Sequence, residues 1–186
     1  RTAGQARFSS ERQPGLSKLA RPREAHPQYR RTGSLVRTSA LRPPSDACLL
    51  AASIVASGQT FTCTPTHVWD GDGPVGCAEG PRLRLAGIAA REMDGPCRTN
   101  QPCPDATAID ARDALVQLMG GARGTIPTGH VVIRGPRLTC RSEGGAGGNR
   151  TAAWCRLPSG ADLSCAMIKT GTVLRWDRYW KGPACR

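Results

Sequence analysis

Residues 82–92 read RLRLAGIAARE, and this stretch indicates the fold more clearly than any other part of the chain. Its first half alternates between arginine and leucine, which places Leu83 and Leu85 on one face of an extended segment and the arginines on the other. This period of two predicts a strand with an apolar and a basic face. Two arginines on one strand face usually form a solvated surface, so the pattern alone does not identify a site.

The residues before this strand predict a hairpin. Residues 60–69, TFTCTPTHVW, partly alternate and are rich in β-forming residues, so they are expected to form a strand. The sequence DGDG at 70–73 is a strong turn signal, and a second strand is expected to begin at 75–77. An EF-hand calcium loop is excluded because no further oxygen ligands or closing glutamate follow at the required spacing.

The residues after residue 92 predict loops, short strands and two helices. The expected elements are a loop at 94–104, a helix at about 106–119 capped by Asp105 with Ile109, Leu115, Val116 and Met119 on its apolar face, strands at 131–133, 137–141 and 151–157 around a Gly-rich tip at 143–148, and a helix at 163–170 capped by Asp162. Short strands separated by turns, together with two helices, predict a small barrel with helices packed outside it.

The composition indicates one folded domain behind a basic N-terminal extension. The 186 residues carry a formal charge of +12, and residues 1–57 hold ten Lys and Arg against three acids. Residues 1–45 show no periodic apolar face and are expected to be a disordered basic leader. The basic balance favours a polyanionic partner such as nucleic acid or an anionic surface. No apolar run approaches the roughly 18 residues needed to cross a bilayer, so no transmembrane segment is expected in the mature chain.

The apolar segment at 46–58 has the layout of a secretory signal. Arginines precede it, an apolar run extends over residues 47–56, and small residues form a cleavage-like site near residues 56–58. A buried strand or helix is the alternative for this segment. The signal interpretation predicts a secreted or periplasmic protein whose mature domain spans residues 59–186.

The cysteines also indicate an oxidising compartment. Of the nine cysteines, Cys48 lies in the apolar segment, and the other eight are expected to form four disulfides. Cys97 and Cys103 are placed to close the 94–104 loop, and Cys140 and Cys155 come within reach if their strands pair across the Gly-rich tip. A zinc site is disfavoured because the chain has no C-x-x-C pair and its histidines do not cluster with cysteines at ligand spacing.

The order of the motifs is more specific than any single motif. A strand runs into DGD at 70–72, and RLRLAGIAARE, a helix, a hairpin ending in NRTAAWCRL at 149–157 and GADLSCAMIKTG at 160–171 follow. This order resembles that of the staphylococcal-nuclease (thermonuclease) family over about residues 60–176. The resemblance implies an α+β fold, a small five-stranded OB-like β-barrel with about two to three helices packed outside it.

The resemblance assigns roles to five residues. Arg84 matches the family's arginine that contacts the scissile phosphate, and Arg150 matches the arginine that holds the phosphate and the leaving group. Glu92 matches the glutamate that orients or deprotonates the attacking water. Asp72 matches a calcium ligand, and Asp70 is its turn-forming partner and a second candidate ligand. Guanidinium groups and a hard cation suit the negative charge that develops during phosphodiester hydrolysis.

The implied function is that of an exported nuclease that hydrolyses phosphodiester bonds of DNA or RNA with little sequence preference, without a stable protein partner. The implied cofactor is a weakly bound Ca²⁺ or another divalent cation, because Ala89 stands where the family has a second calcium-binding aspartate. Arg91 and Gly73 also depart from the family pattern, in place of a proline and a threonine.

The alternative is a non-catalytic, disulfide-braced OB module that binds nucleic acid or another polyanion. The C-terminal aromatic residues Trp176, Tyr179 and Trp180 favour it if nucleic-acid bases stack on them. Ordinary packing of the tail against the barrel is the other interpretation of these residues.

Overall fold

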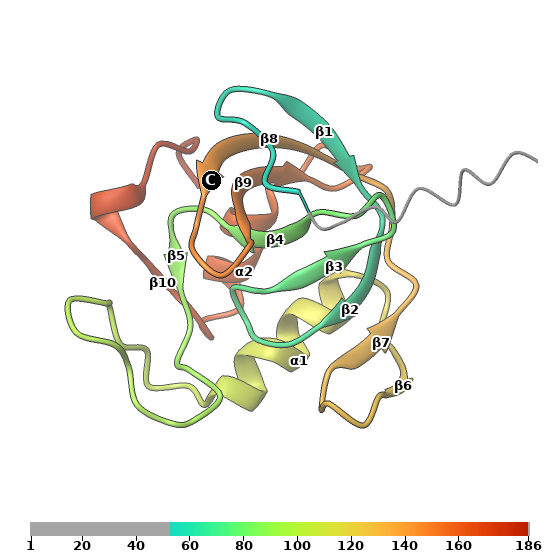
Figure 1. Cartoon of the computed structure of the whole chain (residues 1–186). Coiled ribbons are helices and arrows are strands. Elements are labelled where there is room, and N and C mark those ends of the chain that lie inside the picture. Colours follow the sequence, from blue (N-terminus) through green and yellow to red (C-terminus); the bar gives the residue numbers. More distant parts are fainter. Residues whose placement is uncertain (1–52, 186) are drawn as a thin grey trace, which may run out of the picture. The chain divides into compact units, whose positions relative to one another are not determined.

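The computed structural model describes residues 53–185, which form a mixed α+β fold with a curled sheet and two α-helices (Figure 1). The predicted basic leader at 1–45, the part of the signal-like segment up to residue 52, and Cys48 lie outside the described residues. No helix among residues 53–185 is long and apolar enough to cross a membrane.

The main sheet has eight strands. They are β1 (Thr60–Cys63), β2 (Pro65–Val68), β3 (Val75–Cys77), β4 (Arg82–Leu85), β6 (Ala122–Thr125), β7 (Val131–Ile133), β8 (Leu138–Gly145) and β9 (Thr151–Arg156), in the spatial order β1-β8-β9-β4-β3-β2-β7-β6. Neighbouring strands are antiparallel except β4 and β9, which are parallel. A second, two-stranded sheet joins β5 (Ile88–Ala89) to β10 (Leu174–Arg175).

The structure therefore assigns more strands to the sheet than the expected five. One reason is that the strand expected at 60–69 is broken at Thr64 into β1 and β2, with a register shift between Pro65 and His67. These consecutive strands occupy the first and sixth places of the strand order, so the sheet curls around the core. The other reason is β6, which is exposed along its length and forms only by pairing with β7, so no apolar alternation predicted it.

The helices pack outside the sheet, and their starts test the capping predictions. Helix α1 spans Ala108–Leu118, and its N-cap is Thr107 rather than the predicted Asp105, because Thr107 and Asp110 form a reciprocal capping box. Ile109 is 53% exposed and so does not belong to the buried face, where it was expected. Helix α2 spans Leu163–Lys169 and is capped by Asp162 as predicted, and a short 3₁₀ helix follows at Asp177–Tyr179.

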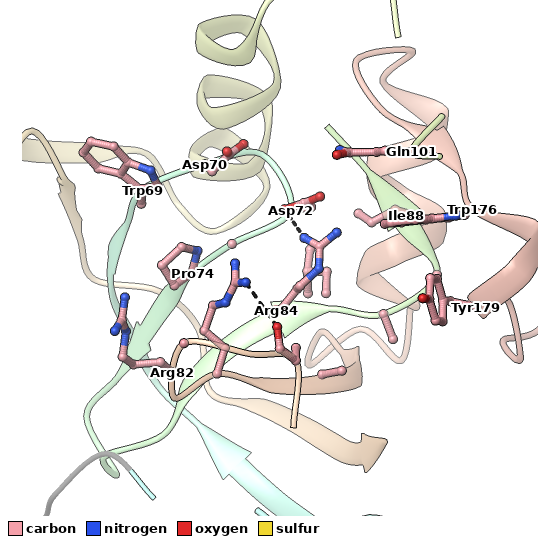
Figure 2. Close-up of a pocket in the computed structure, with 18 of the residues that line it drawn as sticks. Trp69, Asp70, Asp72, Pro74, Arg82, Arg84, Ile88, Gln101, Trp176 and Tyr179 are labelled. Carbon is pink, nitrogen blue, oxygen red and sulfur yellow. Dashed lines mark hydrogen bonds and ion pairs between the residues drawn. The ribbon is translucent and has the colours of Figure 1, made fainter. Parts of the chain in front are cut away.

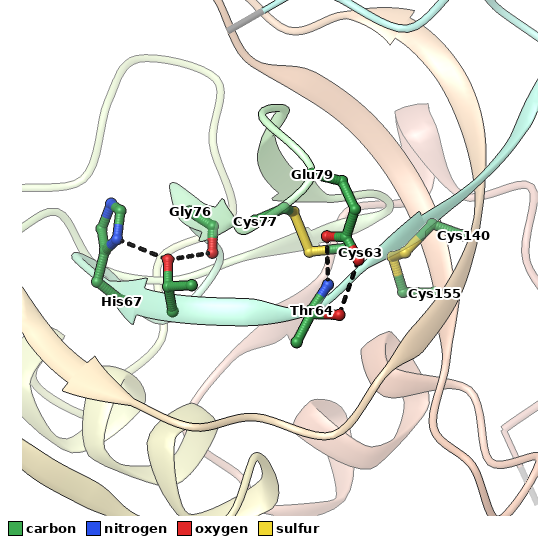
Figure 3. The surroundings of a disulfide bond; sticks show 9 residues. Cys63, Thr64, His67, Gly76, Cys77, Glu79, Cys140 and Cys155 are labelled. Carbon is green, nitrogen blue, oxygen red and sulfur yellow. Dashed lines mark hydrogen bonds between the residues drawn. A yellow bond between two sulfur atoms is a disulfide. The ribbon is translucent and has the colours of Figure 1, made fainter. Parts of the chain in front are cut away.

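Four disulfides brace the fold, as the cysteine count predicted. They are Cys63–Cys77, Cys97–Cys103, Cys140–Cys155 and Cys165–Cys185. Two of them tie β1 to β3 and β8 to β9 within the core (Figure 3). The other two close the predicted 94–104 loop and fasten the C-terminal tail to α2. By the chain-entropy model, each bond that closes a loop of about 15 residues stabilises the fold by about 3 kcal/mol.

The residues at 53–58 lie against the β8–β9 hairpin. The backbone N–H of Val55 donates to Oγ1 of the buried Thr151, and the carbonyl of Val55 accepts from the hydroxyl of Ser142. The N–H of Gly58 adds a bond to the Ser142 carbonyl. This short segment therefore supports the hairpin whose tip carries Arg150.

Candidate functional site

The turn between β2 and β3 buries two carboxylates. Asp70 and Asp72 are only 4% and 5% exposed, although aspartate usually lies at the surface. Gly71 between them packs against α1, where any Cβ would overlap Ala111, so only glycine fits the turn at this point. The DGD sequence is thus wedged between the helix and the sheet, and both carboxylates are held in place.

Arg84 on β4 forms an ion pair with Asp72 (Figure 2). The second carboxylate oxygen of Asp72 accepts a hydrogen bond from the backbone N–H of Ala90 at 3.1 Å. The backbone carbonyl of Asp72 accepts another from the backbone N–H of Leu85 at 2.8 Å. The side chains of Arg84 and Asp72 are 18% and 7% exposed, so solvent screens the pair little. The Arg84 guanidinium is therefore fixed in position before any ligand binds.

The buried carboxylates have perturbed pKa values. Burial and the nearby charge of Asp72 raise the pKa of Asp70 to about 7. Burial also raises the pKa of Asp72, while the attraction of Arg84 and its hydrogen bond act in the opposite direction. Both shifts disfavour the ionised forms of these carboxylates, and the charge of Arg84 offsets this only in part.

Glu92 lies in the loop after β5, where it is paired with an arginine that the motif analysis did not single out. Its two carboxylate oxygens accept from Nε and Nη2 of Arg98 at 2.9 and 3.2 Å. Arg98 belongs to the loop closed by Cys97–Cys103, and its side chain is 69% exposed. The bond from Arg98 is thus an exposed contact that a competing ligand can exchange at small cost.

Arg150 lies at the base of the Gly-rich tip between β8 and β9. Its Nε donates to the Gly147 carbonyl at 3.0 Å, and Nη2 donates to the Ala146 carbonyl at 3.1 Å. None of the ion pairs formed within residues 53–185 involves Arg150. Its guanidinium is oriented by its own hairpin and keeps its full positive charge available.

All five residues to which the family resemblance assigned roles line one cleft of about 1080 Å³, namely Asp70, Asp72, Arg84, Glu92 and Arg150. They come from the β2–β3 turn, β4, the loop after β5 and the β8–β9 tip, so up to 80 residues of sequence separate them. The folded chain thus brings two arginines, the partly exposed carboxylate of Glu92 and the buried acidic turn together in one cleft. This arrangement suits the binding of a phosphodiester and the activation of a water beside it.

The three aromatic residues of the tail separate into two roles. Trp176 and Tyr179 line the cleft, with ring centroids 4.8 Å apart, and the Arg84 guanidinium lies 6.0 Å from the Trp176 ring. Trp180 instead packs edge-on against Trp154, with ring centroids 5.0 Å apart. The packing interpretation therefore holds for Trp180, whereas the stacking of bases on Trp176 and Tyr179 stays a prediction.

The β2–β3 turn offers two carboxylates, Asp70 and Asp72, to a cation. Among residues 53–185, no group of three or more His, Cys, Asp or Glu side chains is arranged to hold a metal ion. Ala89 is fully buried on β5 and contributes no oxygen ligand from its side chain. The mutual repulsion of Asp70 and Asp72 is nevertheless the feature that a divalent cation relieves. Two carboxylates are fewer than the roughly six oxygen ligands of a calcium ion, so a site here would need water or phosphate oxygens to complete it.

The structure adds several residues to the cleft that the motifs did not indicate: Trp69, Arg82, Arg98, Gln101, His130 and Lys181. The alternation of residues 82–85 placed Arg82 and Arg84 on the same strand face, but gave no reason to choose Arg82 as functional. The ring of His130 and the loop-borne Arg98 carried no local signal, because their position depends on contacts between distant segments.

Comparison with protein-family models, with curated proteins and with solved structures found no match to the chain.

Proposed function

We propose that this chain is an exported nuclease of the staphylococcal-nuclease type, which hydrolyses phosphodiester bonds of DNA or RNA with little sequence preference. The observation that carries the proposal is the convergence of Arg84, Arg150, Glu92 and Asp72 from four separate segments on one cleft. Accidental motif similarity gives no reason for these four residues to meet.

The strand pairing supports the OB-like part of the proposal. If β1 with β2, and β7 with β8, are each counted as one bent strand, five segments remain, with β6 as an added edge strand. The segment β1–β2 then pairs with β3 on one side and with β7–β8 on the other, while β4 and β9 are parallel. A ring of five segments with one parallel pair is the arrangement proposed for the barrel.

The charges of the cleft define a role for each group. Arg84 and Arg150 donate to the phosphate oxygens, where negative charge grows as water attacks phosphorus and the bond to the leaving oxygen breaks. Glu92 accepts the proton of that water. Because Arg98 occupies both carboxylate oxygens of Glu92, this contact must loosen before Glu92 acts.

A divalent cation would be held by Asp72 and Asp70, with the remaining ligands supplied by water and the phosphate. When bound, such a cation would further stabilise the negative charge that develops on the phosphate oxygens during hydrolysis. Asp72 also orients Arg84, so its carboxylate serves the arginine whether or not a cation is present.

The test is a hydrolysis assay of the purified chain on DNA and on RNA, with calcium and with chelator. Arg84→Ala and Arg150→Ala are each expected to lower the rate by about a hundredfold, since each removes a donor to the transition state. Arg84→Lys is expected to restore the rate only in part, because an ammonium cannot form the bidentate contact of a guanidinium. Arg141→Ala, an exposed arginine on β8, is the matched control.

One observation favours the non-catalytic alternative, in which the chain binds a polyanion without cleaving it. Both carboxylate oxygens of Glu92 are hydrogen-bonded to Arg98, so Glu92 is not free to act as a general base. A module that only binds needs the aromatic rings and the arginines of the cleft but no general base. Unchanged substrate in the assay, together with tight binding of the same substrate, would select this alternative.

Export forms part of the proposal. Four disulfides form and persist in oxidising compartments, so a secreted or periplasmic location suits this chain. Intact mass after alkylation without reductant checks the paired state. Two or more free thiols in protein from an oxidising compartment would contradict it.

A further inference from the structure

The cleft contains a second group of aromatic rings, separate from Trp176 and Tyr179. Trp69 follows β2, and His130 lies at the tip of the β6–β7 hairpin, immediately before β7. Their ring centroids are 4.9 Å apart, and both side chains are half-buried and line the cleft. Two segments about 60 residues apart thus bring an indole and an imidazole together at the cleft wall.

These rings are held in place from behind. The ring of His67 contacts His130 edge-on at a centroid distance of 5.3 Å and lies over Gly76, where any Cβ would overlap it. The hydroxyl of Thr66 donates to the Gly76 carbonyl, so it accepts from Nδ1 of His67, which fixes that ring (Figure 3). Gly129, at positive φ, packs against the six-membered ring of Trp69. The rings are therefore pre-oriented, which lowers the entropy cost of binding.

The charge beside the rings suits an anion. Burial, with the positive charge of Arg82, lowers the pKa of His130, and burial, His130 and Arg82 lower the pKa of His67. These shifts favour the neutral form of both imidazoles, which suits stacking. Arg82 lines the cleft beside them and forms no ion pair with any of residues 53–185.

The two aromatic groups lie on opposite sides of the central ion pair. Figure 2 shows Trp69 and Arg82 on one side of Asp72 and Arg84, and Trp176 and Tyr179 on the other. A ligand that reached from one group to the other would pass over Arg84. A nucleic-acid strand has this form, with bases to stack on rings and phosphates to pair with arginines.

We propose that Trp69, His130 and Arg82 form a second nucleotide subsite, which binds a base and its phosphate of a single-stranded nucleic acid across Arg84 from Trp176 and Tyr179. The nucleic acid must be single-stranded, because a base can stack on a protein aromatic ring only when it is not stacked between its neighbours in a duplex. The inference rests on the proposed function in one respect, namely that the nucleic-acid strand passes over Arg84 on its way through the cleft. It adds that the chain engages the strand on both sides of the scissile phosphate and so cuts within a strand rather than only at its end.

The test measures binding rather than hydrolysis, with chelator present throughout. Fluorescence anisotropy gives the Kd of labelled oligothymidylates for the full chain, with one probe of two nucleotides and one of about eight, which is within the range that a single OB fold occupies. Trp69→Leu and Arg82→Ala are each expected to weaken binding of the longer probe about tenfold, as loss of one stacked base or one phosphate contact does. The dinucleotide is expected to occupy the Trp176 side, so its binding is expected to change less than twofold.

Matched variants separate this subsite from a structural role of Trp69. Trp69→Phe keeps an aromatic face and is expected to stay within threefold of the unmodified chain, whereas Trp69→Leu is not. Arg141→Ala removes an equal charge from outside the cleft and is expected to change neither probe's Kd more than twofold. Thermal melting of every variant identifies any loss of binding that follows from unfolding.

Equal weakening of both probes by Trp69→Leu, or no weakening of the longer one, would overturn the subsite. Equal Kd values for the two probes in the unmodified chain would overturn it as well. A chain that binds the longer probe through Trp69 but hydrolyses no nucleic acid keeps the subsite and rejects the nuclease. If the separate hydrolysis assay with calcium shows the dinucleotide cleaved as fast as the longer probe, and Trp69→Leu changes neither binding nor cleavage, the nuclease stands and the subsite is rejected.

Discussion

Asp72 in the β2–β3 turn and Arg84 on β4 form a buried pair, whereas Glu92 and Arg150 lie in loops that line the same cleft. The first two residues neutralise one another in a buried position. The other two are occupied by weaker, exchangeable contacts, Glu92 with the exposed Arg98 and Arg150 with carbonyls of its own hairpin. The buried pair is thus fixed before binding, whereas Glu92 and Arg150 must release their present partners.

This difference has a consequence for stability. Removing one member of a buried ion pair leaves an uncompensated charge, while removing an exposed or backbone-bound group leaves its former partners accessible to water. Residues with similar roles in the proposed reaction should therefore differ in what they contribute to folding. The following predictions are ordered by the expected size of the effect.

Arg84→Ala is expected to lower the free energy of unfolding by about 3 kcal/mol, because the buried carboxylate of Asp72 loses its partner. Urea denaturation at neutral pH measures the change. Arg82→Ala on the same strand face is the matched control and is expected to change stability by less than about 0.5 kcal/mol. Adding Asp72→Asn to Arg84→Ala should recover part of the loss, and no recovery would show that the pair is not the cause.

Ala89→Asp is expected to turn the weak cation site into a stronger one by adding a third carboxylate. At a calcium concentration about a hundredfold above Kd, the free energy of unfolding should rise by about 2.7 kcal/mol, more than in the unmodified chain. Without calcium the variant should be the less stable of the two, because position 89 is fully buried. Calorimetric titration gives the affinity, and Asp72→Ala should abolish the calcium effect. Equal calcium responses in the variant and the unmodified chain would contradict the proposed site.

Asp70→Asn is expected to change how stability depends on pH. The pKa of Asp70 is about 7 in the folded chain, against 3.8 for an ordinary aspartate. The folded state therefore holds a proton between these values that the unfolded state has lost, and the free energy of unfolding falls as the pH rises from about 4 to about 7. In chelator, Asp70→Asn should flatten this fall and be about 1 kcal/mol more stable than the unmodified chain at pH 8. Parallel stability curves for the two proteins would contradict the assignment.

Arg150→Ala is expected to have the smallest effect on folding. Its side chain bonds only to carbonyls of the hairpin tip, which water can satisfy, so the free energy of unfolding should change by less than about 0.5 kcal/mol. Hydrolysis should nevertheless fall about a hundredfold, as for Arg84→Ala. A loss of stability as large as that of Arg84→Ala would remove the distinction between the buried pair and the loop residues.

Much of the local structure follows from the sequence alone. Turn residues predicted the β2–β3 and β8–β9 turns, and Asp162 predicted the start of α2. The sequence placed Cys97 near Cys103, and Cys140 near Cys155 if their strands paired, but it left the disulfide connectivity open. These features depend on residues close in the chain, so composition and periodicity are sufficient to indicate them. The N-cap of α1 was misassigned because two acceptable capping residues, Asp105 and Thr107, lie two positions apart.

Only the tertiary structure decided which distant segments meet. The period of residues 82–85 shows that Arg82 and Arg84 share a face, but not that Asp72 pairs with Arg84 while Arg82 stays beside His130. The parallel pairing of β4 with β9, which brings Arg84 and Arg150 to one cleft, has no local signature either. Alternation fixes the direction of a side chain relative to its own strand. The choice of neighbouring strand is fixed by burial of the whole core, which no single segment records.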